Sequence, residues 1–230
     1  MRQDFNFLRP AVGTACALPL LLLYSFNGPW IYRSAFCARD AVLYFAREVL
    51  PLVHGRLGDA FKFHVVGSNA IPDSILRLNG TKLDGITRIH VHGFVEDIRA
   101  LYSRMRISVV PLRWGAGVKG KVNTAMKHGV PVVCTTVAQE GMYLEDGENA
   151  MVTDDTSAFA DKIYQVYTNE DRWNRIVQGG YRNIKTHFSV SNAAHGMATA
   201  LEHVIHKHRP LQSRLRESTT GLSLHQQCRD

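Results

Sequence analysis

The chain has 230 residues, of which 45% are hydrophobic and 20% charged, and its formal net charge at pH 7 is +7. This composition excludes a disordered or fibrous protein, and the length allows one sizeable domain or two small ones. The positive charge suits an anionic ligand, but no repeat of basic and aromatic residues indicates a nucleic-acid module, so we expect no nucleic-acid partner. Four cysteines show neither disulfide-framework nor zinc-site spacing, and we expect no metal centre.

The N-terminal region contains an apolar segment, residues 11–26, that is open to two interpretations. It is shorter than the roughly 20 residues that a membrane-spanning helix needs, yet it suits a targeting segment or an anchor. Alternatively, residues 18–26 form a buried first strand, because buried parallel strands are continuously apolar. We favour the strand, and expect a targeting-like or irregular segment at 1–17 and a cytoplasmic protein. Membrane association through 11–26 is the alternative.

From residue 41 onward, strand patterns and amphipathic helix patterns alternate. Strands are predicted at 61–66, 88–92, 106–111, 131–135 and 150–153. Helices are predicted at 41–54, 72–78, 96–105, 155–167, 172–187 with a break at Gly179 and Gly180, and 191–206. This alternation predicts an α/β fold with a Rossmann-like, doubly wound parallel sheet. We expect the domain to span 18–208 and to be followed by a disordered basic tail, 209–230.

The segment 106–126 combines a β-branched strand, a glycine-rich turn with two lysines, and a helix-forming stretch without a gap. Strand, phosphate-binding loop and helix follow one another in this way in nucleotide-binding folds. From about Val118 onward, the amides of the new helix have no intrahelical partner, and they add the positive end of the helix dipole to Lys119 and Lys121. The segment is therefore a candidate diphosphate site. The competing interpretation is a plain tight turn with solvated lysines.

Two named motifs only partly fit these residues. Gly115, Gly117 and Gly120 have the spacing of the dinucleotide fingerprint, and Glu140 stands where its ribose-binding acid would lie. That fingerprint normally follows the first strand of its domain, whereas several predicted strands precede this one. The same glycines nearly form the nucleoside-triphosphate loop motif, but Val122 replaces the hydroxyl residue that holds magnesium.

The segment 111–133 closely resembles the donor-site region of glycosyltransferase family 4, whose members use nucleotide sugars and have the GT-B fold. Further matching segments occur in the same order, at 46–51, 65–67, 92–97 and 140–141. The resemblance runs from about residue 41 to 187. It implies that this chain corresponds to the C-terminal, donor-binding half of such an enzyme, acting with retention at the sugar and without a metal or other cofactor.

The resemblance also implies roles for individual residues. Gly117, Val118 and Lys119 would hold the donor diphosphate, and Arg113 would reach a phosphate. Thr124 and Glu140 would meet ribose or sugar hydroxyls. The nucleotide base would lie beside three consecutive residues, which are Gly93, Phe94 and Val95. No catalytic base or nucleophile is nominated.

Two departures from the family pattern favour a rival hypothesis. Family members commonly carry two glutamates that bind donor hydroxyls, and Ala116 and Thr124 occupy those places here. Only about 35 residues precede the resembling stretch, too few for the acceptor-binding domain. We therefore expect an unknown acceptor bound by a missing N-terminal domain or a partner chain. The rival is a non-catalytic nucleotide-binding or interaction module, and a nicotinamide-dependent dehydrogenase is a third hypothesis.

Overall fold

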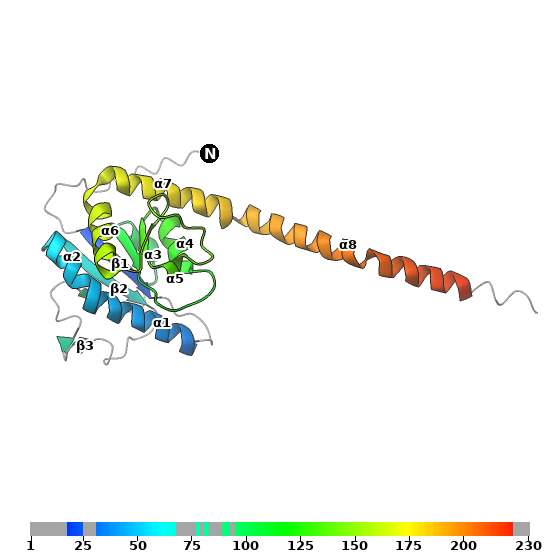
Figure 1. Ribbon diagram of the computed structural model, residues 1–230, viewed down its shortest axis with the longest axis horizontal. Coiled ribbons are helices and arrows are strands. Elements are labelled where there is room, and N and C mark those ends of the chain that lie inside the picture. Colours follow the sequence, from blue (N-terminus) through cyan, green and yellow to red (C-terminus); the bar gives the residue numbers. More distant parts are fainter. Residues whose placement is uncertain are drawn as a thin grey trace, which may run out of the picture. The chain divides into compact units, whose positions relative to one another are not determined.

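A computed structural model describes the backbone of residues 18–24, 31–67, 77–78, 81–82, 89–92 and 95–222. The chain divides into two compact units, Met1–Lys185 and Thr186–Asp230. The first unit contains a six-stranded sheet (Figure 1). The domain boundaries expected from the sequence, at 17/18 and 208/209, stay predictions.

The six strands pair in parallel in the order β5-β2-β1-β6-β7-β8. Their bounds are β1 Leu18–Tyr24, β2 Phe61–Gly67, β5 Ile89–Val91, β6 Ile107–Val110, β7 Val132–Cys134 and β8 Met151–Val152. Each of them falls within or beside a strand predicted from the sequence. The doubly wound parallel sheet is confirmed, and the interpretation of 18–26 as a first strand is confirmed for Leu18–Tyr24.

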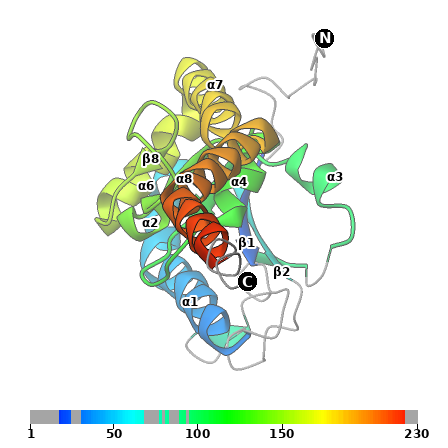
Figure 2. The ribbon, with the colours of Figure 1, turned by 90° about the vertical axis from the view of Figure 1, so that its right-hand side faces the viewer.

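The helices of the first unit connect these strands. They are α1 Ile31–Tyr44, the π-helical turn η1 Phe45–Val49, α2 Leu50–Leu57, α3 Ile98–Tyr102, α4 Gly120–Lys127, α5 Thr136–Gln139, α6 Thr156–Thr168 and α7 Glu170–His187, whose last two residues belong to the second unit. In Figure 2, α2 and α6 lie on one side of β1 and β2, and α3 lies on the other.

The main core fills the space between the sheet and the layer of α1, η1, α2 and α6. At its centre Phe45 stacks on Phe63 with ring centroids 4.6 Å apart, and Phe159 meets Phe45 edge to face at 6.2 Å. Ile107 and Val109 of β6 point into this core. The alternate residues of β6 are buried as well, so β6 is covered on both faces.

The sheet is more polar near its β5 edge. Lys62, His64 and His90 alternate along β2 and β5 with the buried residues of those strands. His64 Nδ1 lies 2.7 Å from His92 Nε2, and the two rings stack. Among the described residues, no group of three histidine, cysteine or acidic side chains is arranged to hold a metal ion.

Three predicted helices differ in the structure. Arg77–Leu78, the end of the predicted helix 72–78, is strand β3, which pairs antiparallel with β4, Thr81–Lys82. The Asn-Gly pair at 79–80 favours a two-residue hairpin, and this signal outweighs the helix-starting Pro72. The rest of that prediction, 72–76, lies outside the described residues.

Helix α7 is also unbroken, contrary to the break predicted at Gly179 and Gly180. A Cβ atom on Gly180 would lie 3.1 Å from Met126 Cγ, and one on Gly179 would lie 2.7 Å from Asn149 Cα. These glycines therefore allow neighbouring segments to approach closely, which is a packing role rather than a helix-ending one.

In the second unit, α8 runs over Val190–Leu222, so the helix does not end at 206 as predicted. The sequence after 206 contains several leucines and arginines, which are good helix formers and outweigh the single Pro210. Residues 223–230 lie outside the described residues. Across the part of the chain that the structure describes, no helix is both long and apolar enough to span a membrane.

Candidate functional site

The strand order places one particular loop where ligands bind in doubly wound sheets. All strands run in the same direction, but the order in which successive strands are added to the sheet reverses between β1 and β6, which are neighbours although they lie far apart in sequence. Ligands bind in such folds beyond the carboxyl ends of the strands, at this switch point. The glycine-rich loop, residues 111–119, leaves the carboxyl end of β6 there and leads into α4.

The glycine-rich loop is open and is shaped by its glycines. Gly115 and Gly117 have φ angles of +138° and +75°, which side chains rarely tolerate. A Cβ atom on either of them, or on Gly120, would meet no atom within 4 Å. Val118 is 64% exposed. The backbone of this loop therefore faces open space that a ligand can occupy.

Helix α4 begins at Gly120, two residues later than predicted. Lys119 is its N-cap, with a non-helical backbone, and the Lys119 amide donates to Met142 Sδ at 3.1 Å. The Val118 and Lys119 amides therefore lie outside the helix, because the positive φ of Gly117 delays its start. The first-turn amides, which have no carbonyl partner within the helix, belong to Gly120 and Lys121.

Arg113 and Trp114 tie the glycine-rich loop to α1. The Arg113 guanidinium donates from Nε to Asp40 Oδ2 at 2.9 Å and from Nη2 to Asp40 Oδ1, and it lies over the Tyr44 ring. Trp114 Nε1 donates to the same carboxylate at 3.1 Å. The hydrogen bonds with Asp40 raise the pKa of Arg113 above its ordinary value. The structure thus pairs Arg113, a predicted phosphate ligand, with a carboxylate. Nothing in the sequence around Asp40 indicated this partnership.

Lys119 and Glu140, both predicted site residues, contact each other. The Lys119 side chain is only 4% exposed, and its Nζ donates to the Glu140 carbonyl oxygen at 3.1 Å. The Glu140 carboxylate lies 3.9 Å from the same Nζ and is mostly exposed. Met142, which follows closely, is fully buried, and its carbonyl accepts from Asn183 Nδ2 at 3.0 Å. Lys119 therefore helps to pin the segment after α5.

The remaining predicted site residues lie in different surroundings. Thr124, in the second turn of α4, donates its hydroxyl to the Gly120 carbonyl at 2.8 Å and keeps acceptor capacity only. Val95, which lies in the connection from β5 to α3, is half-buried. Gly93 and Phe94 lie outside the described residues.

The sequence places Lys121 beside Lys119 in the glycine-rich turn, but the predicted site residues include only Lys119. It lies in the first turn of α4, and burial lowers its pKa to about 8, while the neighbouring Cys37 of α1 acts in the opposite direction. No hydrogen bond or ion pair engages its ammonium among the described residues. The sequence pattern alone cannot show that the ammonium groups of Lys119 and Lys121 differ in their contacts.

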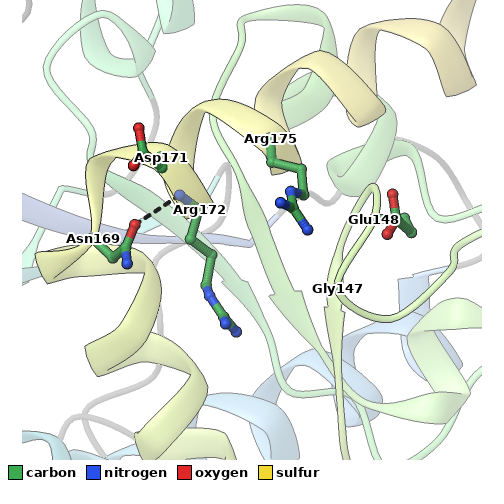
Figure 3. A pocket seen from close by; sticks show the side chains of 6 residues that line it. All are labelled: Gly147, Glu148, Asn169, Asp171, Arg172 and Arg175. Atoms are coloured by element: carbon green, nitrogen blue, oxygen red, sulfur yellow. Dashed lines mark hydrogen bonds between the residues drawn. The ribbon is translucent and has the colours of Figure 1, made fainter.

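A separate cavity of about 330 Å³ lies between the segment before β8 and the start of α7, whose residues Figure 3 shows. Arg172 and Arg175 of α7 line it together with Asn169, Asp171, Gly147 and Glu148. These two arginines are exposed, acids stand beside them, and Arg172 already donates to Gln165 Oε1 at 2.7 Å. The cavity lies near the amino ends of the strands, so topology favours the glycine-rich loop as the functional site.

A comparison with family models shows the family of this chain. The family model described as glycosyl transferases group 1 matches residues 30–169. No curated protein sequence matches the chain. Among solved structures, a Staphylococcus aureus TarM variant, in complex with Fondaparinux, alpha-GlcNAc-glycerol and UDP, aligns with a TM-score of 0.63 and 17% identity, over 83% of this chain and 38% of TarM.

Two further structures are similar. The pneumococcal O-GlcNAc transferase GtfA, in complex with UDP and GlcNAc, has a TM-score of 0.62 and 19% identity over 85% of this chain and 37% of its own. The C-terminal domain of LpcC from Francisella tularensis has a TM-score of 0.58 and 16% identity, over 76% of this chain and 88% of that domain. At these identities the likeness shows the fold, one half of a GT-B glycosyltransferase. The chain spans less than half of the TarM and GtfA chains.

Proposed function

Since this chain belongs to the glycosyl transferases of group 1, we propose that it binds a nucleotide-diphosphate sugar at the carboxyl edge of its sheet. The diphosphate lies against the glycine-rich loop and the start of α4. Thr124 and Glu140 meet ribose or sugar hydroxyls, and the base lies beside residues 93–95. Family 4 is the branch of these enzymes that we propose.

One observation carries this proposal, namely the coincidence of the switch point with the glycine-rich loop and an eight-residue helix whose start is flanked by two lysines. Free first-turn amides, the positive end of the helix dipole and cationic side chains together favour a doubly charged anion. The open space over Gly115, Gly117 and Gly120 leaves room for that anion close to the backbone. The UDP in the TarM and GtfA structures supports the same ligand class.

We propose that the reaction is transfer of the glycosyl group to an acceptor hydroxyl with retention, without a metal. The site's cations and amides would stabilise the charge that develops on the departing nucleoside diphosphate, which is electrostatic catalysis of leaving-group departure. Because the chain spans 38% of TarM, we also propose that a further domain or a partner chain binds the acceptor.

The binding step is tested by isothermal titration calorimetry of the purified chain with UDP, GDP and NAD. We expect one nucleoside diphosphate to bind and NAD not to bind. Gly117→Val, which strains a residue at φ +75° within the loop, should weaken binding at least tenfold. Gly58→Val is the matched control, because Gly58 has φ +56° at the end of α2 and lies away from the site. The control should lose stability and keep its affinity.

Two outcomes would count against this function. Binding of NAD alone would favour the dehydrogenase hypothesis. An absence of binding to all three nucleotides, with a folded chain by circular dichroism, would remove the donor-site proposal.

A non-catalytic module remains a second candidate because of one specific observation. Ala116 and Thr124 occupy the places where the resemblance puts glutamates, and the Thr124 hydroxyl is used within its own helix. A carboxylate accepts hydrogen bonds from sugar hydroxyls more strongly than a hydroxyl does. Incubating the chain with UDP-sugars and measuring released UDP separates the two candidates. Nucleotide binding without any release of UDP favours the module.

A further inference from the structure

The two lysines beside the glycine-rich loop differ in what their ammonium groups already contact. Lys119 is buried and donates to the Glu140 carbonyl, with the Glu140 carboxylate 3.9 Å away. Turning this ammonium toward a phosphate would leave a carbonyl oxygen without its donor, which costs free energy. Lys119 is therefore already committed to holding the segment after α5 in place.

Lys121 has the opposite character. Its side chain is half-buried with Cys37 of α1 as a neighbour, and no carboxylate or carbonyl of the described residues pairs with its ammonium. Among the described side chains of α1, the Cys37 thiol is the titratable neighbour that acts on Lys121. A partly desolvated cation without a counter-charge is unfavourable, and an approaching anion stabilises it.

The backbone around Lys121 is also suited to an anion. Lys121 belongs to the first turn of an eight-residue helix, so its own amide and that of Gly120 have no carbonyl partner within the helix. A Cβ atom on Gly120 would meet open space. The unpaired ammonium and the free amides thus originate from the same turn, at the switch point of the sheet.

From this contrast we infer that Lys121 is the cation that binds the donor diphosphate, whereas Lys119 is a positioning residue that holds the Glu140 segment. The inference rests on the proposed function and assigns its charged contact. It moves the charged contact from the predicted Lys119 to the next lysine along the chain.

The inference has a measurable signature, which is proton uptake. With a pKa of about 8, Lys121 is roughly half protonated at pH 8 in the free chain. A bound diphosphate favours the ammonium, so binding at pH 8 should take up about half a proton. The phosphates of UDP are fully ionised at that pH and contribute none. At pH 7 the uptake should nearly disappear.

The experiment is calorimetric titration with UDP at pH 7 and pH 8, in buffers of different ionisation enthalpy, so that proton uptake is measured directly. Lys121→Met should weaken UDP binding roughly 10- to 100-fold, as expected for a lost charge-assisted hydrogen bond. Lys121→Arg should keep most of the affinity and abolish the uptake, because arginine does not titrate near pH 8. Lys127→Met, an exposed lysine in the last turn of α4, is the matched control.

Two further variants separate the neighbours. Lys119→Met should lower the unfolding midpoint and retain the proton uptake. Cys37→Ser should also retain the uptake, which excludes the thiol as its source. If UDP binds without proton uptake at pH 8, or if Lys119→Met and not Lys121→Met abolishes that uptake, the inference is overturned while the proposed function stands. If the unmodified chain binds no nucleotide, the proposed function itself fails.

Discussion

The two halves of the sheet, divided at the switch point, differ in how they are covered. Strands β6, β7 and β8 are buried at every residue. Strands β2 and β5 are buried on the face that holds Phe63 and Ile89, but they present Lys62, His64 and His90 on the other, and the exposure of those residues varies. One half is packed on both sides, and the other is apolar on one side and mixed on the other, where Val66 is buried beside His64.

This difference indicates what each half contributes to the site. The fully buried half holds β6 rigidly, and the glycine-rich loop leaves its end. The other half contributes through α1, whose Asp40 holds Arg113 and Trp114 of that loop. The loop is therefore fixed from both halves. Stability should depend mainly on the fully buried half, whereas pH sensitivity should depend mainly on the half that carries the histidines.

The largest expected effect is in the buried half. Gly179→Ala places a methyl group against the Glu148 carbonyl oxygen and 2.7 Å from Asn149 Cα, and backbone cannot move aside as a side chain can. We expect a loss of about 3 kcal/mol or more in unfolding free energy. Denaturant unfolding followed by circular dichroism measures it.

Gly180→Ala is the matched control for that variant. Its methyl group would meet Met126 Cγ at 3.1 Å, the side chain of a flexible residue, so we expect a loss of at most about 1 kcal/mol. Equal losses for the two variants would contradict the packing role of Gly179.

The second effect is in the half that carries the histidines. Burial, followed by the nearby His92, His90 and Lys62, lowers the pKa of His64 from 6.5 to about 4. Because the folded pKa lies below the unfolded one, stability is fully present above pH 6.5 and is lost as the pH falls toward 4. We expect a loss of roughly 1–2 kcal/mol after allowing for solvent screening.

Unfolding measured at several values of pH between 7 and 4 tests this prediction. His64→Gln should flatten the pH dependence, whereas His90→Gln, an exposed neighbour on β5, should keep most of it. A profile that is the same with and without His64 would assign the acid sensitivity to other groups.

The third effect is at the connection between the halves. Asp40→Ala releases Arg113 and Trp114, so the loop must be ordered when the nucleotide binds, and we expect UDP affinity to fall roughly 3- to 10-fold. Calorimetry gives the affinity, and Trp114 fluorescence reports the release. A gain in affinity would instead support Arg113 as the phosphate ligand predicted from the sequence.

The smallest effect is expected at the cavity of Figure 3. Arg172→Ala combined with Arg175→Ala removes both of its arginines. We expect the affinity for UDP to stay within about twofold, because the cavity lies near the amino ends of the strands and the glycine-rich loop at their carboxyl ends. A large loss of affinity in this double variant would indicate that the nucleotide binds at this cavity instead.

Much of this fold was predictable from the sequence because its signals are local. Continuous apolar runs identified the buried strands, and helix α6 begins within one residue of its prediction because Asp155 is an effective N-cap that accepts from the Ala158 amide at 2.7 Å. The errors arose where a distant partner decides the outcome. Gly179 and Gly180 resemble a helix break until the loop at 148–149 and Met126 are seen beside them.

The candidate site was predictable as a segment but not as a set of contacts. The glycine spacing and the two lysines located the loop, since they are consecutive in the chain. The engagement of Lys119 with Glu140, and of Arg113 with Asp40, joins residues 21 and 73 positions apart. Such pairings depend on how strands and helices meet, and one sequence contains no record of them.

The position of β1 also has a consequence for how the chain folds. The first strand lies in the middle of the sheet, and Leu20 pairs with Ile107, near the middle of the chain. During synthesis β1 can therefore pair with β2 early, but its other edge stays unpaired until β6 has left the ribosome. Parallel sheets with such distant pairings fold slowly. Until then the unpaired edge of β1 can pair with other chains, which a chaperone would prevent.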